Sequence, residues 1–450
     1  MDMVATKATF RKYPAYKESG VEWLGEVPEE WDIIKLGSLF RDVSDKNHPE
    51  LPLLSITREK GVIVRDVEDD STNHNFIPDD LSGYKLLKEG QFGMNKMKAW
   101  QGSYGVSPKT GIVSPAYYIF DFTKPVLPRF FHLAIRSKRY VSYFGSASDG
   151  VRIGQWDLSK DRMKKIPFFL PPLAEQTAIA NFLDDKTAKI DQAIAQKEQL
   201  IALLKESKQI IIQNAVTKGL NPNVKMKDSG VEWIGEIPEH WEVKRFRYVF
   251  NLGKGLTITK ENLQDEGIAC VNYGEIHSKY GFEVNPEIHE LKCVDNEYLK
   301  SSSNALLKQG DFVFADTSED IEGSGNFTYL NSNQKTFAGY HTVIARPKRL
   351  VDSRFLAYSF DSQSFRNQIR NRVKGVKVYS ITQSILSEPS VWLPTLEEQH
   401  SIVEYLDNEC SKYHLSIQQQ FKQVNKLKEY KATLIDSAVT GKIKVTNYGK

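Results

Sequence analysis

The chain has 450 residues, 40% hydrophobic and 26% charged, a composition typical of folded globular protein. Its formal net charge of +3 is too small to indicate a partner by itself. No apolar run is long enough to span a membrane, and the first residues, MDMVATKATFRKYPAY, lack an apolar signal segment. Three cysteines without CxxC spacing argue against a disulfide framework and fit a reducing compartment. We therefore expect a cytoplasmic protein that does not contact the membrane.

The chain contains two copies of one unit. GVEWLGEVPEEW at 20–31 is repeated as GVEWIGEIPEHW at 230–241, and LPPLAEQ at 170–176 is matched by LPTLEEQ at 393–399. The stretches between these motifs share little sequence. The pattern predicts an internal repeat with a pseudo-two-fold axis, so that the chain presents two similar but non-identical binding faces.

Each copy begins with a variable, strand-rich part. Between residues 20 and 170, short apolar runs such as GVIV at 61–64 and AYYIF at 116–120 are separated by Pro and Gly. One helix is predicted over 129–144, with its counterpart over 354–372, and each is followed by a Gly–Val–basic element. The recurring tryptophans are predicted to anchor the cores: Trp23, Trp31, Trp233 and Trp241.

Two basic segments occupy equivalent places in the two copies. Ten Lys/Arg stand against three Asp/Glu between Lys124 and Lys165, and nine stand against two between Arg346 and Lys377. One such segment alone fits a solvated face as well as a binding surface. Because the segment recurs at the same place, and phosphate neutralisation needs clustered cations, the pattern favours nucleic-acid binding.

Each copy ends in a long predicted helix, over 173–218 and 396–441, that starts after prolines and stops at glycine. Apolar residues alternate at spacings of four and three, which is the seam of a coiled coil. The seam residues are Ile190, Ile194, Ile201, Leu204 and Ile211 in the first helix and Tyr413, Ile417, Val424, Leu427 and Leu434 in the second. Polar interruptions match as well, Lys197 with Gln420 and Lys208 with Lys431. We expect the two helices to pair with each other.

Motifs of the common catalytic sites are missing from the sequence. There is no GxxxxGK[ST] phosphate loop and no HExxH. Leu170-Pro171-Pro172-Leu173 lacks the polar first and aromatic last residues of an amino-methyltransferase site. Pro78-Asp79 is not followed by the Asp/Glu-x-Lys of a nuclease. The chain is therefore interpreted as a binder.

With these motifs at these places, the chain resembles the specificity (S) subunit of type I restriction–modification enzymes over nearly its full length. The repeated GVEW motifs, the proline junctions, the helical tails and the phrase GDFVFADTSED at 310–320 carry the resemblance. It implies an α+β fold, with two mixed α/β target-recognition domains separated by two long antiparallel coiled-coil helices. The implied boundaries are recognition domains at 1–170 and 223–392 and spacer helices at 171–222 and 393–450.

The resemblance also implies a non-catalytic subunit that reads a bipartite, asymmetric site on double-stranded DNA. Two adenine methyltransferase (M) subunits would dock on the helices, and two restriction (R) subunits would join them. S-adenosylmethionine, ATP and Mg²⁺ would belong to those partners, with no cofactor, metal or catalytic residue in this chain.

Base edges in the major groove are read mainly by Arg, Lys, Asn and Gln. The polar and aromatic loop 95–101 and the basic segments supply such side chains. The predicted DNA contacts are Lys96, Lys98, Gln101, Arg136, Lys138, Arg139, Arg152 and Gln155 in the first copy, and Arg366, Arg370, Arg372, Lys374 and Lys377 in the second.

Two other classes of function remain open from the residues alone. A coiled-coil scaffold whose globular parts bind proteins would show no sequence-dependent DNA retention. A methyltransferase with an unrecognised site would transfer methyl groups without any partner.

Overall fold

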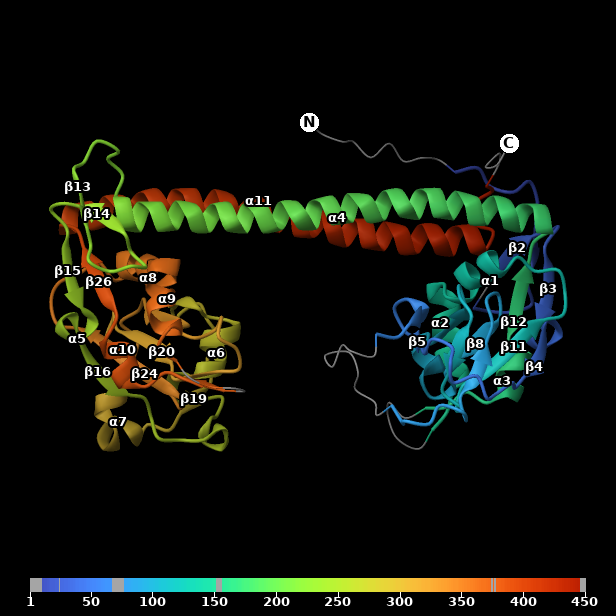
Figure 1. Cartoon of the computed structure of the whole chain (residues 1–450), viewed down its shortest axis with the longest axis horizontal. Helices are drawn as coiled ribbons and strands as arrows, with labels where there is room; N and C mark the ends of the chain where they lie inside the picture. The colour runs from blue at the N-terminus through green and yellow to red at the C-terminus, as the bar shows by residue number, and fades with distance from the viewer. Residues whose placement is uncertain are drawn as a thin grey trace. The chain divides into compact units, whose positions relative to one another are not determined.

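The computed structural model describes residues 10–23, 25–66, 77–150, 156–373, 375 and 378–445. The chain divides into unit 1, Met1–Glu198 with Phe421–Lys450, and unit 2, Gln199–Gln420. Each unit contains one globular head and a part of each of two long helices, α4 (Leu173–Lys218) and α11 (Leu396–Val439) (Figure 1). We call residues 10–172 head 1 and residues 219–395 head 2.

Head 1 is built on a four-stranded antiparallel sheet in the order β4-β11-β8-β9. Phe40 of β4 stacks on Phe92 of β8 at 5.2 Å between ring centroids, and Phe131 of α1 meets Phe92 edge-on at 5.3 Å. These rings hold α1 on the sheet. The elements of head 1 are β1 (Tyr16–Glu18), β2 (Glu26–Pro28), β3 (Asp32–Lys35), η1 (Leu36–Leu39), β4 (Phe40–Val43), β5 (Leu54–Thr57), β6 (Gly61–Val64), β7 (Lys85–Leu87), β8 (Phe92–Met94), η2 (Lys96–Gln101), β9 (Tyr104–Val106), β10 (Gly111–Val113), β11 (Tyr118–Phe122), α1 (Pro128–Ile135), α2 (Lys138–Ala147), α3 (Lys160–Lys165) and β12 (Pro167–Leu170).

Head 2 repeats this plan with a five-stranded sheet in the order β16-β24-β20-β22-β18. The fifth strand, β18, lies parallel to β22 and has no counterpart among the described strands of the head 1 sheet. The elements of head 2 are β13 (Met226–Asp228), β14 (Glu236–Pro238), β15 (Glu242–Arg245), α5 (Phe246–Val249), β16 (Phe250–Lys254), η3 (Lys260–Asn262), β17 (Ile268–Val271), α6 (Tyr273–Ser278), β18 (Phe282–Val284), β19 (Cys293–Val294), α7 (Tyr298–Ser301), η4 (Ser303–Ala305), β20 (Phe312–Ala315), β21 (Thr317–Ser318), β22 (Phe327–Leu330), β23 (Thr336–Ala338), β24 (Thr342–Pro347), α8 (Ser353–Asp361), α9 (Gln363–Arg370), β25 (Tyr379–Ser380), α10 (Gln383–Ser387) and β26 (Ser390–Leu393).

The helix predicted in each head is broken in two. Head 1 has α1 and α2 where one helix was predicted over 129–144, and head 2 has α8 and α9 where one was predicted over 354–372. The break falls at Ser137 and at Ser362, both buried and both extended, with ψ of 153° and 149°. The break changes the direction of the chain so that both helix pieces bury their apolar residues. This tertiary packing outweighs the helical periodicity that predicted one continuous helix.

The repeated tryptophans differ in burial. Trp31 and Trp241 are fully buried, as predicted for core anchors. Trp23 is partly buried and stacks on Tyr143 at 4.4 Å. The prediction is wrong for Trp233, which is 36% exposed.

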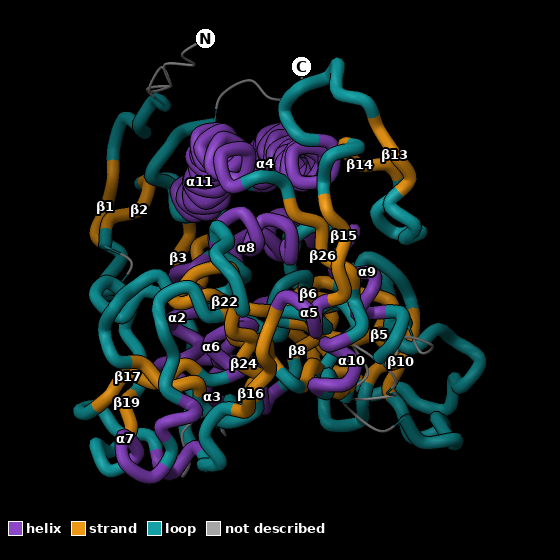
Figure 2. Tube along the Cα trace, turned by 90° about the vertical axis from the view of Figure 1, so that its left-hand side faces the viewer, coloured by secondary structure: helices purple, strands orange, loops and turns teal. Residues whose placement is uncertain are grey.

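The long helices begin and end where prolines and glycines predict. Leu173 and Leu396 follow Pro172 and Pro394 closely, and Gly219 and Gly441 follow the helices with φ of 71° and 74°. A positive φ suits glycine and stops a helix. Figure 2 views both helices close to end-on.

Within each unit, the helix segments run antiparallel. In unit 1, Lys431 binds both carboxylate oxygens of Asp191 at 2.7 and 2.6 Å, and Lys428 pairs with Glu198 at 3.2 Å. In unit 2, Ile212 and Ala215 share one buried cluster with Ile402 and Leu406. The predicted seam residues Ile190, Ile194, Ile201, Val424 and Leu434 are buried, and Leu204, Ile211, Tyr413, Ile417 and Leu427 are half-buried.

Candidate nucleic-acid interface

The polar loop of head 1 leaves the sheet after β8 as the short helix η2. The side chain of Asn95 accepts a hydrogen bond from the Met97 amide at 3.2 Å, which caps η2 at its start. Gly102, with φ of 93°, ends it. Met97 is 60% exposed and Lys98 is exposed, so this loop presents side chains to solvent.

The structure places this loop beside the segment that follows the Gly–Val–basic element. Trp100 contacts Trp156 at 5.0 Å between ring centroids, and Lys96 pairs with Asp157 at 3.3 Å. The Leu158 amide donates to the Lys96 carbonyl at 3.1 Å. Two regions that the sequence singled out separately are therefore neighbours. Arg152 and Gln155 themselves lie outside the described residues.

Head 2 builds the same arrangement with different residues. The loop after β20 forms β21, which pairs with β25, and the Ile381 amide donates to the Asp316 carbonyl at 2.7 Å. The loop thus lies beside the segment after Gly375. Lys374 and Lys377 lie outside the described residues.

Two hollows of about 790 and 670 Å³ flank the head 2 loop, and both include Thr317 and His341. His341 has φ of 55°, an uncommon conformation outside glycine that surrounding contacts must hold. Its Nδ1 donates to Asp316 Oδ1 at 3.1 Å, which leaves Nε2 for another partner. Gln383, Lys254 and Thr257 also line the smaller hollow. These side chains carry the donors and acceptors that base edges require.

A partly buried chain of hydrogen bonds supports the loop. His277 donates from Nε2 to the Thr317 carbonyl at 2.8 Å and accepts at Nδ1 from the Asn326 amide at 2.9 Å. Asn326 in turn accepts from Arg366 at 2.8 Å. Both ring nitrogens are occupied, so His277 positions the loop and has no nitrogen to offer a ligand.

Several predicted DNA contacts bind other residues of their own unit. Arg136 donates to four carbonyls, those of Gly102, Tyr104, Arg58 and Glu59, and burial lowers its pKa. The others so engaged are Arg139, with Asp436 and the Trp23 carbonyl; Arg366, with Asp361 and Asn326; Arg370, with Glu322; and Arg372, with the Gln368 carbonyl. These contacts favour a structural role for the five arginines.

Other predicted contacts keep their side chains available. Lys98 and Lys138 are exposed, and neither side chain has a hydrogen bond or ion pair within the described part of the chain. The side chain of Lys96 pairs with Asp157, and Gln101 is half-buried in the same loop. The basic segments are thus less open to DNA than their local charge suggested, because acidic residues distant in sequence neutralise them.

Sequence reasoning missed the residues that join each head to its long helix. Gln176 accepts from the Leu127 amide and donates to the Pro171 carbonyl, both at 2.8 Å. Gln399 makes the same pair of bonds with Asp352 and Pro394, both at 2.9 Å. Both glutamines are buried. The sequence feature that could have identified them is the Gln that ends the repeated motifs LPPLAEQ and LPTLEEQ.

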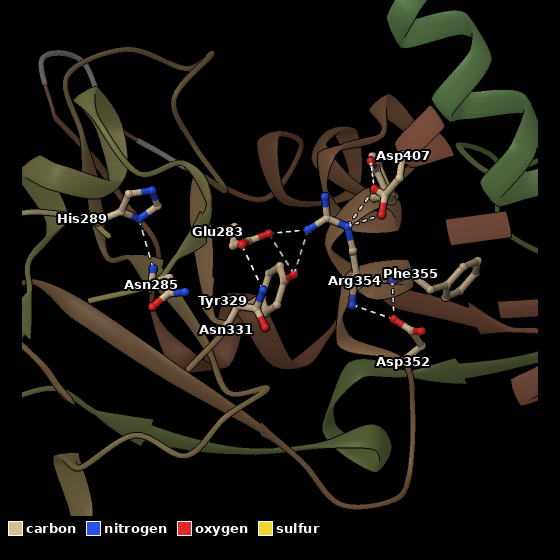
Figure 3. Close-up of polar contacts among 10 residues, drawn as sticks. Glu283, Asn285, His289, Tyr329, Asn331, Asp352, Arg354, Phe355 and Asp407 are labelled. Atoms are coloured by element: carbon tan, nitrogen blue, oxygen red, sulfur yellow. Dashed lines mark hydrogen bonds and ion pairs between the residues drawn. The ribbon is translucent and has the colours of Figure 1, made fainter. Parts of the chain in front are cut away.

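A second contact between each head and its long helix involves charged side chains, and we call both kinds of contact joints. Arg354 of α8 hydrogen-bonds Asp407 of α11 and also meets Glu283 and Tyr329 (Figure 3). At the matching place in unit 1, Arg129 of α1 forms an ion pair with Asp184 of α4. Over the described ranges, no three His, Cys, Asp or Glu residues are placed to hold a metal ion, and no helix is long and apolar enough to cross a membrane.

The sequence profile of the family described as the type I restriction modification DNA specificity domain matches residues 117–203 and 238–426. The chain belongs to this family. It is 24% identical to the type I restriction enzyme MjaVIII specificity subunit of Methanocaldococcus jannaschii over 446 residues, covering 96% of this chain and 98% of the relative. It is 26% identical to the EcoKI specificity subunit of Escherichia coli K12, over 60% of this chain and 55% of that one.

Solved structures show the same fold. A chain from work on complex assembly and conformational transition of the type I system superposes with a TM-score of 0.67 at 15% identity, covering 92% of this chain and 98% of that one. The HsdS subunit from Thermoanaerobacter tengcongensis superposes with a TM-score of 0.50 at 15% identity, over 93% and 98%. The predicted family and fold class are therefore confirmed, as is the role of a specificity subunit rather than a catalytic one.

Proposed function

We propose that this specificity subunit reads a bipartite, asymmetric DNA target, one half with each head, and docks two methyltransferase subunits, and through them two restriction subunits, on its paired helices. The observation that supports this most is the loop beside the segment that follows the Gly–Val–basic element, an arrangement that both heads share but with different side chains. Head 1 presents Lys96, Lys98 and Trp100, whereas head 2 presents Thr317 and His341. Two different surfaces on one scaffold suit two different half-sites.

Within this proposal, the side chains divide by chemistry. Lys98, Lys138, Arg152, Lys374 and Lys377 are suited to phosphate contacts, which set register without reading sequence. Gln101, Gln155, His341 and Gln383 can hydrogen-bond base edges. S-adenosylmethionine, ATP and Mg²⁺ would be held by the partner subunits, and the assembled complex would act on DNA in the cytoplasm.

The test is to map methylated adenines in DNA from cells that carry this chain with its methyltransferase. We expect one bipartite motif, lost when residues 243–392 are deleted. Lys98→Ala and Lys377→Ala should each weaken DNA binding by the assembled complex and reduce the slope of log affinity against log salt by about 1. Lys225→Ala, which removes an exposed lysine of head 2 paired with Glu239 outside the long helices and the basic segments, is the control. Methylation by the isolated chain, or a motif without two halves, would overturn the proposal.

A further inference from the structure

In each head, one arginine pairs with an aspartate of the long helix that follows the head in the chain. Arg129 lies in the first turn of α1 and Arg354 in the first turn of α8, and Asp184 and Asp407 lie at matching positions of α4 and α11. Arg354 Nε donates to both oxygens of Asp407, at 2.7 and 2.8 Å. Each pair lies within its own unit. The same contact between a head and its long helix therefore occurs once in each copy of the repeat.

In head 2, this arginine is enclosed by further partners. Its Nη1 reaches Glu283 of β18 and the Tyr329 hydroxyl of β22, the latter at 3.1 Å. Asn331 donates to Glu283 at 3.0 Å, and Tyr358 donates to Asp407 at 2.6 Å. Figure 3 shows the guanidinium of Arg354 between the two carboxylates. Three elements of the head are therefore tied to one point of α11.

The charges at this joint depend on one another. Burial alone would lower the pKa of Arg354, but its hydrogen bonds with Asp407 and Tyr329 raise that pKa above the ordinary value. Burial would likewise raise the pKa of Glu283, but the Asn331 hydrogen bond and the Arg354 charge lower it. Removing one charged partner leaves another half-buried charge unpaired, so the stability of the cluster depends on all of its members.

The joint of head 1 is simpler. The side chain of Arg129 is 59% exposed, against 32% for Arg354. Leu133 stands where head 2 has Tyr358, and Glu283 comes from β18, the strand without a described counterpart in the head 1 sheet. Arg129 therefore holds its head by one exposed ion pair, which constrains it less.

We propose that Arg354, and more weakly Arg129, are positioning residues that fix each head on its segment of the helix pair and thereby set the gap between half-sites that the complex accepts. The inference rests on the proposed bipartite target. One base pair changes the position along DNA by about 3.4 Å, so a small movement at a joint is enough to admit a neighbouring gap. Neither arginine reads bases in this scheme.

Adenine methylation mapped across a genome tests this directly, because every gap length is sampled in one experiment. Relative to the natural gap, sites one base pair longer or shorter should gain methylation roughly tenfold in Arg354→Ala, as expected for the loss of charged hydrogen bonds. The gain should be roughly threefold in Arg129→Ala, which removes a single ion pair. The half-site sequences should stay the same. Arg349→Ala, which removes an ion pair between Arg349 and Glu242 within head 2, is the matched control and should change nothing.

Asp407→Asn supplies a second variant of nearly unchanged volume, should Arg354→Ala fail to fold. Unchanged gap selectivity in a folded Asp407→Asn complex overturns the inference, as does a changed half-site sequence, which would make the joint part of the reading surface. Failure of the proposed function looks different, because the wild-type complex would then show no bipartite motif at all.

Discussion

The two heads share a scaffold but differ in how strictly each part of it is repeated. The bonds of Gln176 to residues 127 and 171 are reproduced atom for atom by Gln399. The loops proposed to face DNA have no such correspondence. Residues are thus kept where a head meets its helix and replaced where it would meet a target.

An intermediate case lies inside the sheets. Gln91 accepts from the Lys88 amide at 2.7 Å and donates to Asp121 of the neighbouring strand. In head 2, Asp311 accepts from the Lys308 amide at 2.8 Å and pairs with Arg346 of the neighbouring strand. The acceptor at the turn is kept, while the cross-strand partner is exchanged for one of opposite charge. A buried polar group needs a partner, but the partner's chemical type is free to change.

The largest effect is expected at the glutamine joints. Gln176→Ala and Gln399→Ala should each lower the free energy of unfolding by about 3 kcal/mol, because each leaves one partly buried amide and one buried carbonyl unsatisfied. Denaturant unfolding measures both. Gln192→Ala, at an exposed position of α4, should change stability by less than about 0.5 kcal/mol. If the two variants lost clearly different amounts of unfolding free energy, the two glutamine joints would not be equivalent.

The next effect is acid sensitivity confined to head 1. Burial, followed by the charge of Arg136, lowers the pKa of His132 to about 4, and Ala357 occupies the matching place in head 2. Between pH 6.5 and 4 the unfolded chain binds the proton and the folded head does not, so head 1 should lose up to about 3 kcal/mol of stability as pH falls through that range. Hydrogen exchange of α1 and α8, corrected for its intrinsic pH dependence, compares the heads. His132→Asn should abolish the difference; an equal response of both heads would argue against His132.

The smallest effect concerns salt. Arg139 of α2 pairs with Asp436 of α11 at 3.3 Å, whereas Ser364 and Gln213 make the corresponding contact in unit 2 without charge. Raising the salt concentration should weaken the unit 1 contact by about 0.5 kcal/mol and leave unit 2 unchanged. The double variant Arg139→Ser with Asp436→Gln copies the unit 2 pair. If exchange of α2 in that variant kept its salt response, the ion pair would not be the cause.

Much of the fold could be predicted because its signals are local. Alternating apolar spacings between Ile190 and Ile211 marked a seam, and Gly219 and Gly441 marked the helix ends. The break at Ser137 and Ser362 could not be predicted, because it is decided by packing of two helix pieces against a sheet formed elsewhere in the chain.

The candidate nucleic-acid interface could likewise be predicted only in part. The sequence singled out the loop at 95–101 and the basic segments, but not that β21 and β25 would bring such a loop and segment together in head 2. The sequence pattern also predicted Arg136 and Arg366 as available cations. In the structure, the carbonyl of Gly102 and the side-chain amide of Asn326, both distant in sequence, accept hydrogen bonds from them.

The repeat, the family, the two long helices and their seam follow from the sequence alone, because periodicity, proline and glycine act over a few residues. Three features depend on tertiary packing: which arginines bind their own chain, where the head helices break, and the role of Gln176, Gln399, Arg129 and Arg354 as joints. Those outcomes depend on partners far away in sequence, and a charge or amide shows its role only once folding has placed its partner within hydrogen-bonding distance.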